Sequence, residues 1–162
     1  MIFQGRVWRF GNDVDTDVII PVQHCRGTLS ELAKHCMESV VPDFSEKVHS
    51  GDIIVAGTNF GCGSSREPAP LAIKAAGISC IIAGSFARIF YRNAFNVGLP
   101  LLESSEIPAD IKQGDELEVD LESGNVKLAA GNKTFRTNAI PPFMQELIRD
   151  GGLLKHIAKN LK

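Results

Sequence analysis

Residues 59–70, NFGCGSSREPAP, decide how this chain is interpreted. They follow DIIVAG, a short apolar run typical of a buried strand, and they precede LAIKAAG, which has the spacing of a helix. Gly61 and Gly63 allow the backbone to adopt positive φ angles and to approach a ligand closely. Ligands usually bind at the carboxyl ends of strands in open α/β sheets, so this loop is the first candidate site.

Strand and helix patterns alternate on both sides of the loop. FQGRVWRF predicts a strand at residues 3–10, VIIP adds a short stretch of sheet, and ISCIIA predicts a buried strand. LSELAKHCMESV predicts a helix over residues 29–40, capped by Thr28 or Ser30 and ended by Pro42. LAIKAAG predicts a short helix that Gly77 stops, and SFARIFYRNAFNVG predicts one with Ser85 near its N-cap and Gly98 near its end. This alternation favours parallel strands covered by helices.

The pattern changes from Gly114 onward. DELEVDL, the turn ESGN, VKLAAG and NKTFRTN predict hairpins, and residues 141–162 predict one or two amphipathic helices. No repeat or change of composition divides the chain. We therefore expect an α/β fold with a mixed sheet, in a single domain over residues 1–162.

Composition excludes several classes of protein. Of the 162 residues 44% are apolar and 22% charged, and the net charge is -2, which argues against disorder and against a nucleic-acid partner. The chain has neither a signal-peptide pattern nor an apolar run of about 18 residues, so we expect a cytoplasmic protein with no membrane contact.

The four cysteines match no zinc or redox motif, which predicts that this chain binds no metal. Cys36 and Cys80 are interpreted as small buried hydrophobic residues, whereas the roles of Cys25 and Cys62 stay open.

The chemistry of the glycine loop favours an anion. No GxxxxGK[ST] or GxGxxG phosphate motif is present, but Arg66 follows two serines, and a guanidinium grips a carboxylate with two parallel hydrogen bonds. An equally good alternative is a helix capping box formed by Ser64 and Glu67. Pro68 and Pro70 favour an exposed turn ahead of the helix, which suits binding more than packing.

Two further groups of polar residues qualify as site candidates. Asp13, Asp15 and Asp17 superficially suggest a calcium loop, but Val18 and His24 stand where glycine and glutamate are required, so calcium is rejected. Arg88, Arg92 and Asn93 have helical spacings of i, i+4 and i+5, so they face either a cleft, a partner or solvent.

Three segments together resemble one family. They are DVDTDVIIP, NFGCGSSREPAP and SFARIFYRNAFNVGLPL, and in this order they resemble the small subunits of 3-isopropylmalate dehydratase, or isopropylmalate isomerase. This family is related to the mobile C-terminal domain of aconitase. The matches span residues 1 to about 103, and their joint presence is more specific than any one motif.

The resemblance implies a swivelling three-layer β/β/α fold and a non-covalent large subunit that holds a [4Fe-4S] cluster on three cysteines. It also implies the dehydration and rehydration of a 2-hydroxy dicarboxylic acid, by which 2-isopropylmalate becomes 3-isopropylmalate in leucine biosynthesis. By motif position Ser64 is the base, Ser65 and Arg66 bind a substrate carboxylate, and Asp17 lies near the cleft. We expect the Arg66 charge and the amides of the helix after the loop to favour the Ser64 alkoxide.

The chain departs from the family pattern after Pro21. Members usually carry Arg or Lys and then Tyr-Leu, which meet the variable group of the substrate, but residues 22–28 are VQHCRGT. His24 and Cys25 predict a smaller or more polar wall, Arg26 favours a further carboxylate, and Pro68 replaces a common histidine. Citramalate, dimethylmalate and homocitrate-type acids therefore stay open as substrates. A non-catalytic module that binds carboxylates alone is the alternative from another class.

Overall fold

The computed structural model describes residues 1–161, which form a seven-stranded sheet in the order β4-β3-β2-β1-β5-β6-β7. The strands are β1 (Ile2–Arg9), β2 (Ile53–Ala56), β3 (Cys80–Ala83), β4 (Leu101–Glu103), β5 (Glu116–Asp120), β6 (Asn125–Leu128) and β7 (Thr134–Arg136). The α-helices are α1 (Thr16–Ile19), α2 (Leu29–His35), α3 (Phe44–Lys47), α4 (Pro68–Ala75), α5 (Arg88–Asn96), α6 (Ile107–Asp110), α7 (Pro142–Asp150) and α8 (Leu153–Asn160). Two short 3-10 helices are η1 (Val22–His24) and η2 (Ala130–Asn132).

The sheet changes type at β1. Strands β1 to β4 pair in parallel, whereas β1, β5, β6 and β7 pair in antiparallel fashion. All four residues of β2 and all four of β3 are buried, as expected for parallel strands covered on both faces. The predicted βα alternation and the predicted hairpins after Gly114 are both confirmed.

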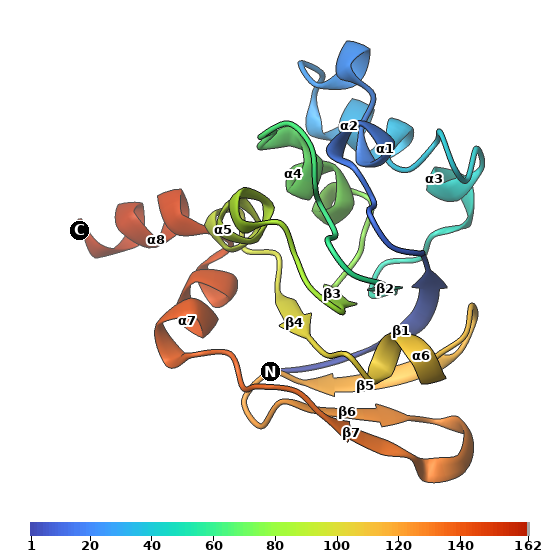
Figure 1. The fold of residues 1–162 in the computed structure, drawn as a ribbon. Helices are drawn as coiled ribbons and strands as arrows, with labels where there is room; N and C mark the ends of the chain where they lie inside the picture. Colours follow the sequence, from blue (N-terminus) through green and yellow to red (C-terminus); the bar gives the residue numbers. More distant parts are fainter. Residues whose placement is uncertain (162) are drawn as a thin grey trace.

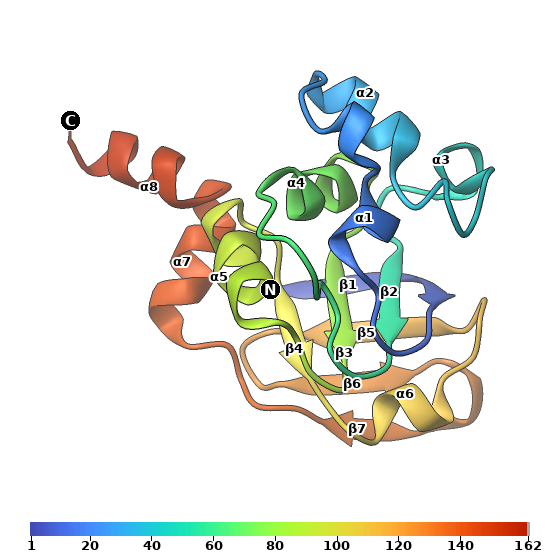
Figure 2. The ribbon, with the colours of Figure 1, turned by 45° about the horizontal axis from the view of Figure 1, so that its top comes forward.

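The curled sheet and its helices form layers. Figures 1 and 2 place α1, α2, α4 and α5 on one side of the parallel strands, and α6 with strands β5 to β7 on the other. This helix, parallel-sheet and antiparallel-sheet order confirms the predicted mixed α/β fold. One cluster of buried hydrophobic side chains runs through these layers and supports the proposal of a single domain.

The C-terminal segment forms two helices, α7 and α8, and Lys162 at its end lies outside the described residues. Gly151 and Gly152, with φ values of 82° and 117°, separate the two helices. Figure 1 shows α8 projecting away from the sheet. No helix among residues 1–161 is long and apolar enough to span a membrane.

Several sequence-based boundaries were wrong. The run VIIP is no strand, because Asp15 caps a helical turn at Thr16–Ile19. Helix α2 starts at Leu29 as predicted but ends at His35, because Cys36 is extended and Met37 has φ 58°. The predicted Ser85 cap fails as well, since α5 begins at Arg88 and the Ser85 hydroxyl accepts a bond from the Asn59 amide instead.

Candidate active site

Loops from the ends of three parallel strands interlock through backbone hydrogen bonds. The Gly61 amide donates to Val14 in the loop after β1 (2.8 Å), and the Thr16 amide donates back to Cys62 (2.9 Å). On the other side the Phe60 amide donates to Ser85 in the loop after β3 (3.0 Å). Because these bonds involve main-chain atoms, the path of the glycine loop is fixed independently of its side chains.

The two glycines of the loop are required by space as well as by conformation. Gly61 has φ 81°, and a Cβ atom there would stand 2.1 Å from the Phe90 ring. Gly63 has φ 89°, and its Cβ would stand 2.3 Å from an Asp15 carboxylate oxygen. Any larger residue would push the loop away from α5 or from the loop after β1.

A cavity of about 150 Å³ lies where the glycine loop meets the start of α5. Its lining comprises Thr16, Gly61, Gly63, Ser64, Ser65, Arg66, Ala87, Arg88, Ile89 and Phe90. The cavity therefore collects the serine and arginine residues that the sequence singled out. It is smaller than the roughly 300–1,000 Å³ usual for ligand pockets.

The two serines are exposed, and their hydroxyls have no hydrogen-bond partner among residues 1–161. The backbone of Ser64 is held, because the Thr16 hydroxyl donates to its carbonyl at 2.9 Å. The capping-box alternative is wrong, since α4 begins at Pro68 with Glu67 at its N-cap and without a side-chain cap. The Ser64 hydroxyl is thus free to contact a ligand.

The positive helix end at this cavity belongs to α5 and not to α4. The expected amides of α4 are unsuited, because Pro68 and Pro70 carry no N–H and the Ala69 amide donates to Arg66. The N-cap residue Ala87 and the first three residues of the nine-residue helix α5, Arg88 to Phe90, line the cavity instead. The helix has no side-chain cap, and the Ala87 amide itself donates to Phe60. First-turn amides lack intrahelical acceptors and carry partial positive charge, so α5 favours an anion here.

Arg66 is only 21% exposed, and Asp17 holds it in place. The distance from Arg66 Nη1 to Asp17 Oδ1 is 2.6 Å, and the same Nη1 lies 3.9 Å from Cys25 Sγ. The Nε and Nη2 donors of Arg66 have no partner in the described part of the chain. One side of the guanidinium is therefore oriented by protein while the other remains available to a carboxylate.

Asp15 and Asp17, in the segment that follows β1, have separate roles. The Asp15 side chain accepts a hydrogen bond from the Asp17 amide at 2.7 Å and caps α1. This cap fixes the backbone of the segment that packs against Gly63. Asp17 is 60% exposed and reaches Arg66, as its predicted place near the cleft implies. Sequence reasoning found this segment but not the ion pair, because the partners are 49 positions apart in the chain.

Helix α5 brings one of its three candidate residues to the cavity. Arg88 lines the cavity and is exposed. Arg92 and Asn93 are absent from the cavity lining; Arg92 is exposed on the next turn and Asn93 is half-buried. A site role is supported for Arg88, and the other two stay predictions of a cleft or partner contact.

The loop of residues 22–28 contributes Cys25 to the site, through the contact with Arg66. His24 does not line the cavity, and its ring stacks on His35 with the centroids 3.5 Å apart. Arg26 is exposed. His35 is thus part of a histidine cluster that no linear pattern indicates.

None of the buried cysteines is activated. Burial raises the pKa of the Cys80 thiol to about 12 and raises that of Cys36 further, so both are core residues as predicted. Burial, and then the negative charge of Asp15 and Asp13, also raises the pKa of Cys62. Cys62 therefore stays a neutral thiol at neutral pH, because the thiolate is the reactive form of cysteine.

This curled mixed sheet, with a serine and an arginine on the loop after its second strand, defines a domain of the aconitase C-terminal class. Residues 14–106 match the family described as Aconitase C-terminal domain. The chain is 58% identical to the 3-isopropylmalate dehydratase small subunit of Syntrophus aciditrophicus, over 98% of both chains. It is 57% identical to the 2,3-dimethylmalate dehydratase small subunit of Eubacterium barkeri, over 95% of both.

A solved structure agrees with these relatives. The crystal structure of 3-isopropylmalate dehydratase from Methanocaldococcus jannaschii superposes with a TM-score of 0.93 at 48% identity, covering 99% of this chain and 96% of that one. This chain belongs to the family of 3-isopropylmalate dehydratase small subunits.

Proposed function

We propose that this chain is the small subunit of a two-subunit hydro-lyase that converts 2-isopropylmalate into 3-isopropylmalate in leucine biosynthesis. The observation that carries the proposal is the meeting of Ser64, Arg66 and Arg88 with the start of α5 in one open cavity. Family membership supports the same conclusion. The reaction removes water across two neighbouring carbons and adds it back in the opposite sense.

Ser64 acts as the base in this proposal. As an alkoxide it takes a proton from the carbon next to the hydroxyl-bearing carbon, and it later returns a proton to the other carbon of the alkene. An ordinary serine hydroxyl is too weakly acidic for this role. The partial positive charge at the start of α5 and the charges of Arg66 and Arg88 favour the ionised oxygen.

The two arginines suit a substrate with two carboxylates. Arg66 presents its free Nε and Nη2 donors while Asp17 holds its Nη1. Arg88 lines the same cavity from α5 and has no ion-pair partner among residues 1–161. Ser65 adds a hydroxyl next to Arg66. Orienting both ends of the acid places its reacting carbon consistently against one base.

A large subunit completes the site. The cavity is small and open, and Ser64 and Ser65 face outward. This chain does not fit as the holder of an iron–sulfur cluster, because its one group of three neighbouring ligand residues in the described chain contains no cysteine. We assign the [4Fe-4S] cluster to the large subunit, where its iron would supply Lewis-acid activation of the leaving hydroxyl.

A second candidate substrate is 2,3-dimethylmalate. Relatives named for isopropylmalate and for dimethylmalate are 58% and 57% identical to this chain, so overall similarity does not separate the two acids. The loop of residues 22–28, which contacts Arg66 through Cys25, is the segment that we expect to decide between them.

The test is reconstitution with the large subunit. Turnover of 2-isopropylmalate, 2,3-dimethylmalate and citramalate is followed through the absorbance of the alkene acid, with each subunit alone as the control. We expect activity only in the mixture, with one acid giving the highest kcat/KM. Activity of the iron-free small chain alone contradicts the two-subunit proposal. Binding of carboxylates without turnover in the mixture favours the non-catalytic module.

A further inference from the structure

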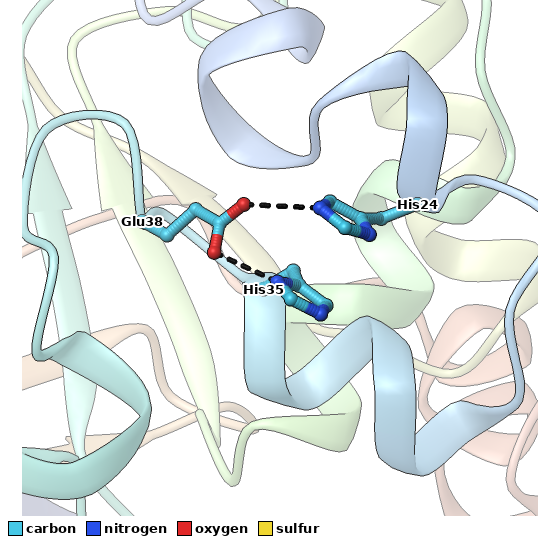
Figure 3. A group of neighbouring side chains, drawn as sticks. All are labelled: His24, His35 and Glu38. Carbon is cyan, nitrogen blue, oxygen red and sulfur yellow. Dashed lines mark hydrogen bonds and ion pairs between the residues drawn. The ribbon is translucent and has the colours of Figure 1, made fainter.

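Two histidines and a glutamate meet on the side of the molecule that carries α2. His24 ends η1, His35 ends α2, and Glu38 lies in the turn that follows. His24 Nε2 is 3.3 Å from Glu38 Oε1, and His35 Nδ1 is 2.7 Å from Glu38 Oε2. Figure 3 shows both rings directed at the same carboxylate. One ligand atom from each residue lies within 4.8 Å of the other two.

Local structure fixes the three residues before any ligand binds. A capping box between Thr28 and Glu31 starts α2 and thereby sets the position of His35 one helix length later. The chain then reverses at Met37, which has φ 58° and whose amide donates to Ile19 at 2.8 Å. This reversal brings Glu38 back beside His35 and His24. Backbone geometry therefore brings these three residues together.

The donor set suits a divalent transition metal. Neutral imidazole nitrogens and one carboxylate are common ligands of zinc, at about 2.0–2.2 Å, so neighbouring ligands in a tetrahedron are roughly 3.4 Å apart. The spacing of 3.3 Å between His24 Nε2 and Glu38 Oε1 is close to that value, whereas the 2.7 Å between His35 Nδ1 and Glu38 Oε2 is a hydrogen-bond distance that has to lengthen when a metal binds. The side chains of His24, His35 and Glu38 are 28%, 23% and 31% exposed, which leaves room for metal entry and for a water as fourth ligand.

Metal binding requires one small rearrangement. The rings are parallel at 3.5 Å, so their in-plane lone pairs run side by side and do not yet converge on one point. Rotating the two partly exposed rings away from the parallel arrangement directs both lone pairs at one point. Metal binding needs a lone pair on His24 Nε2 and on His35 Nδ1, so the proton of each ligating imidazole has to lie on the other ring nitrogen.

We propose that His24, His35 and Glu38 form a binding site for one divalent transition-metal ion of the zinc type. The ion ties η1 to the end of α2 and so restrains the loop of residues 22–28. The next residue, Cys25, contacts Arg66, so the occupied site also steadies the wall beside that arginine. The site is separate from the Ser64 cavity, and its existence does not depend on the proposed dehydratase activity.

The test is zinc titration of the metal-free full-length chain by calorimetry. We expect one saturable equivalent in the wild type, and affinity at least roughly tenfold weaker in His24→Ala and in Glu38→Gln. The matched controls are His49→Ala and His156→Ala, which remove the two histidines outside the cluster and should leave the affinity unchanged. Cys25→Ser, which removes the neighbouring thiol, should also leave it unchanged.

Two further measurements can contradict the proposal. Melting temperatures without metal show whether each variant is folded, and zinc should raise the melting temperature of the wild type but not that of His24→Ala. Cobalt should give the visible spectrum of a tetrahedral nitrogen and oxygen site without thiolate charge-transfer absorption. No saturable zinc binding, undiminished binding by folded His24→Ala, or a thiolate spectrum that Cys25→Ser abolishes would each overturn the proposal.

Discussion

The glycine loop, residues 57–67 between β2 and α4, contains Arg66, and the loop of residues 22–28 contacts that arginine through Cys25, but the two loops are held in different ways. Main-chain hydrogen bonds to the loops after β1 and β3 fix the glycine loop. The second loop is positioned by η1 and by side chains, namely His24 against Glu38 and Cys25 against Arg66. The first loop carries the residues proposed for chemistry, and the second borders them.

This difference suggests why related proteins with the same fold can act on different substrates. A loop fixed by backbone bonds keeps its shape when its side chains change, so it suits the invariant step of proton transfer. A loop held by side chains changes its shape with its sequence, so it suits the recognition of a variable substrate group. Mutations in the two loops should therefore change different kinetic constants, and the following predictions test that division.

The largest effect is expected for Ser64→Ala. Loss of the base should lower kcat by about 10² or more in the reconstituted enzyme. Because the Ser64 hydroxyl has no hydrogen bond in the described chain and caps no helix, stability should change by less than about 0.5 kcal/mol. Steady-state kinetics and thermal unfolding measure the two quantities. A near-normal kcat would remove Ser64 from the chemistry.

Arg66→Lys should follow in size. Lysine keeps the charge opposite Asp17 but loses the planar fork. The fall in kcat/KM at saturating large subunit should correspond to a loss of about 1.5–3 kcal/mol in transition-state stabilisation. Arg136→Lys, an exposed change on β7 outside the cavity, is the control and should be neutral. Wild-type kcat/KM in Arg66→Lys contradicts the carboxylate clamp. A lower subunit affinity alone indicates an interface role.

Gly61→Ala should lower stability more than Gly114→Ala. Both glycines have positive φ, 81° and 87°, but only the Cβ at position 61 would meet a neighbour, the Phe90 ring at 2.1 Å. The shared cost of the left-handed backbone is about 1–2 kcal/mol, and we expect roughly 1–3 kcal/mol more for Gly61→Ala. Denaturant unfolding of both variants gives the difference. Equal losses would show that the loop is not tightly fixed against α5.

The smallest effect concerns the start of α2. Hydrogen bonds from the Thr28 backbone and then from its side chain lower the pKa of Glu31 below its ordinary 4.5. A lowered folded-state pKa stabilises the protein above pH 4.5, and this contribution disappears as pH falls through the folded value. Glu31→Gln should therefore melt slightly below wild type at pH 7, with the gap closing in acid. A gap independent of pH would contradict the capping role of the charge.

The features that depend on neighbouring residues could be predicted from the sequence alone. The alternation of buried strands and helices, the hairpins after Gly114 and the Thr28 cap all follow from local periodicity and turn chemistry. The same local pattern singled out Ser64, Ser65 and Arg66, because glycines and prolines leave little other structure for that segment. The family resemblance rested on three such segments, each continuous in the chain.

The residues that lie opposite those segments could be found only from the folded structure. It placed the start of α5, and not of α4, against Ser64, and it paired Arg66 with Asp17. It also ended α2 at His35 and turned Glu38 back toward His24. One cause accounts for all of these contacts. Each contact joins residues that are adjacent only after the strand ends come together or the chain reverses, so no spacing along the sequence contains it.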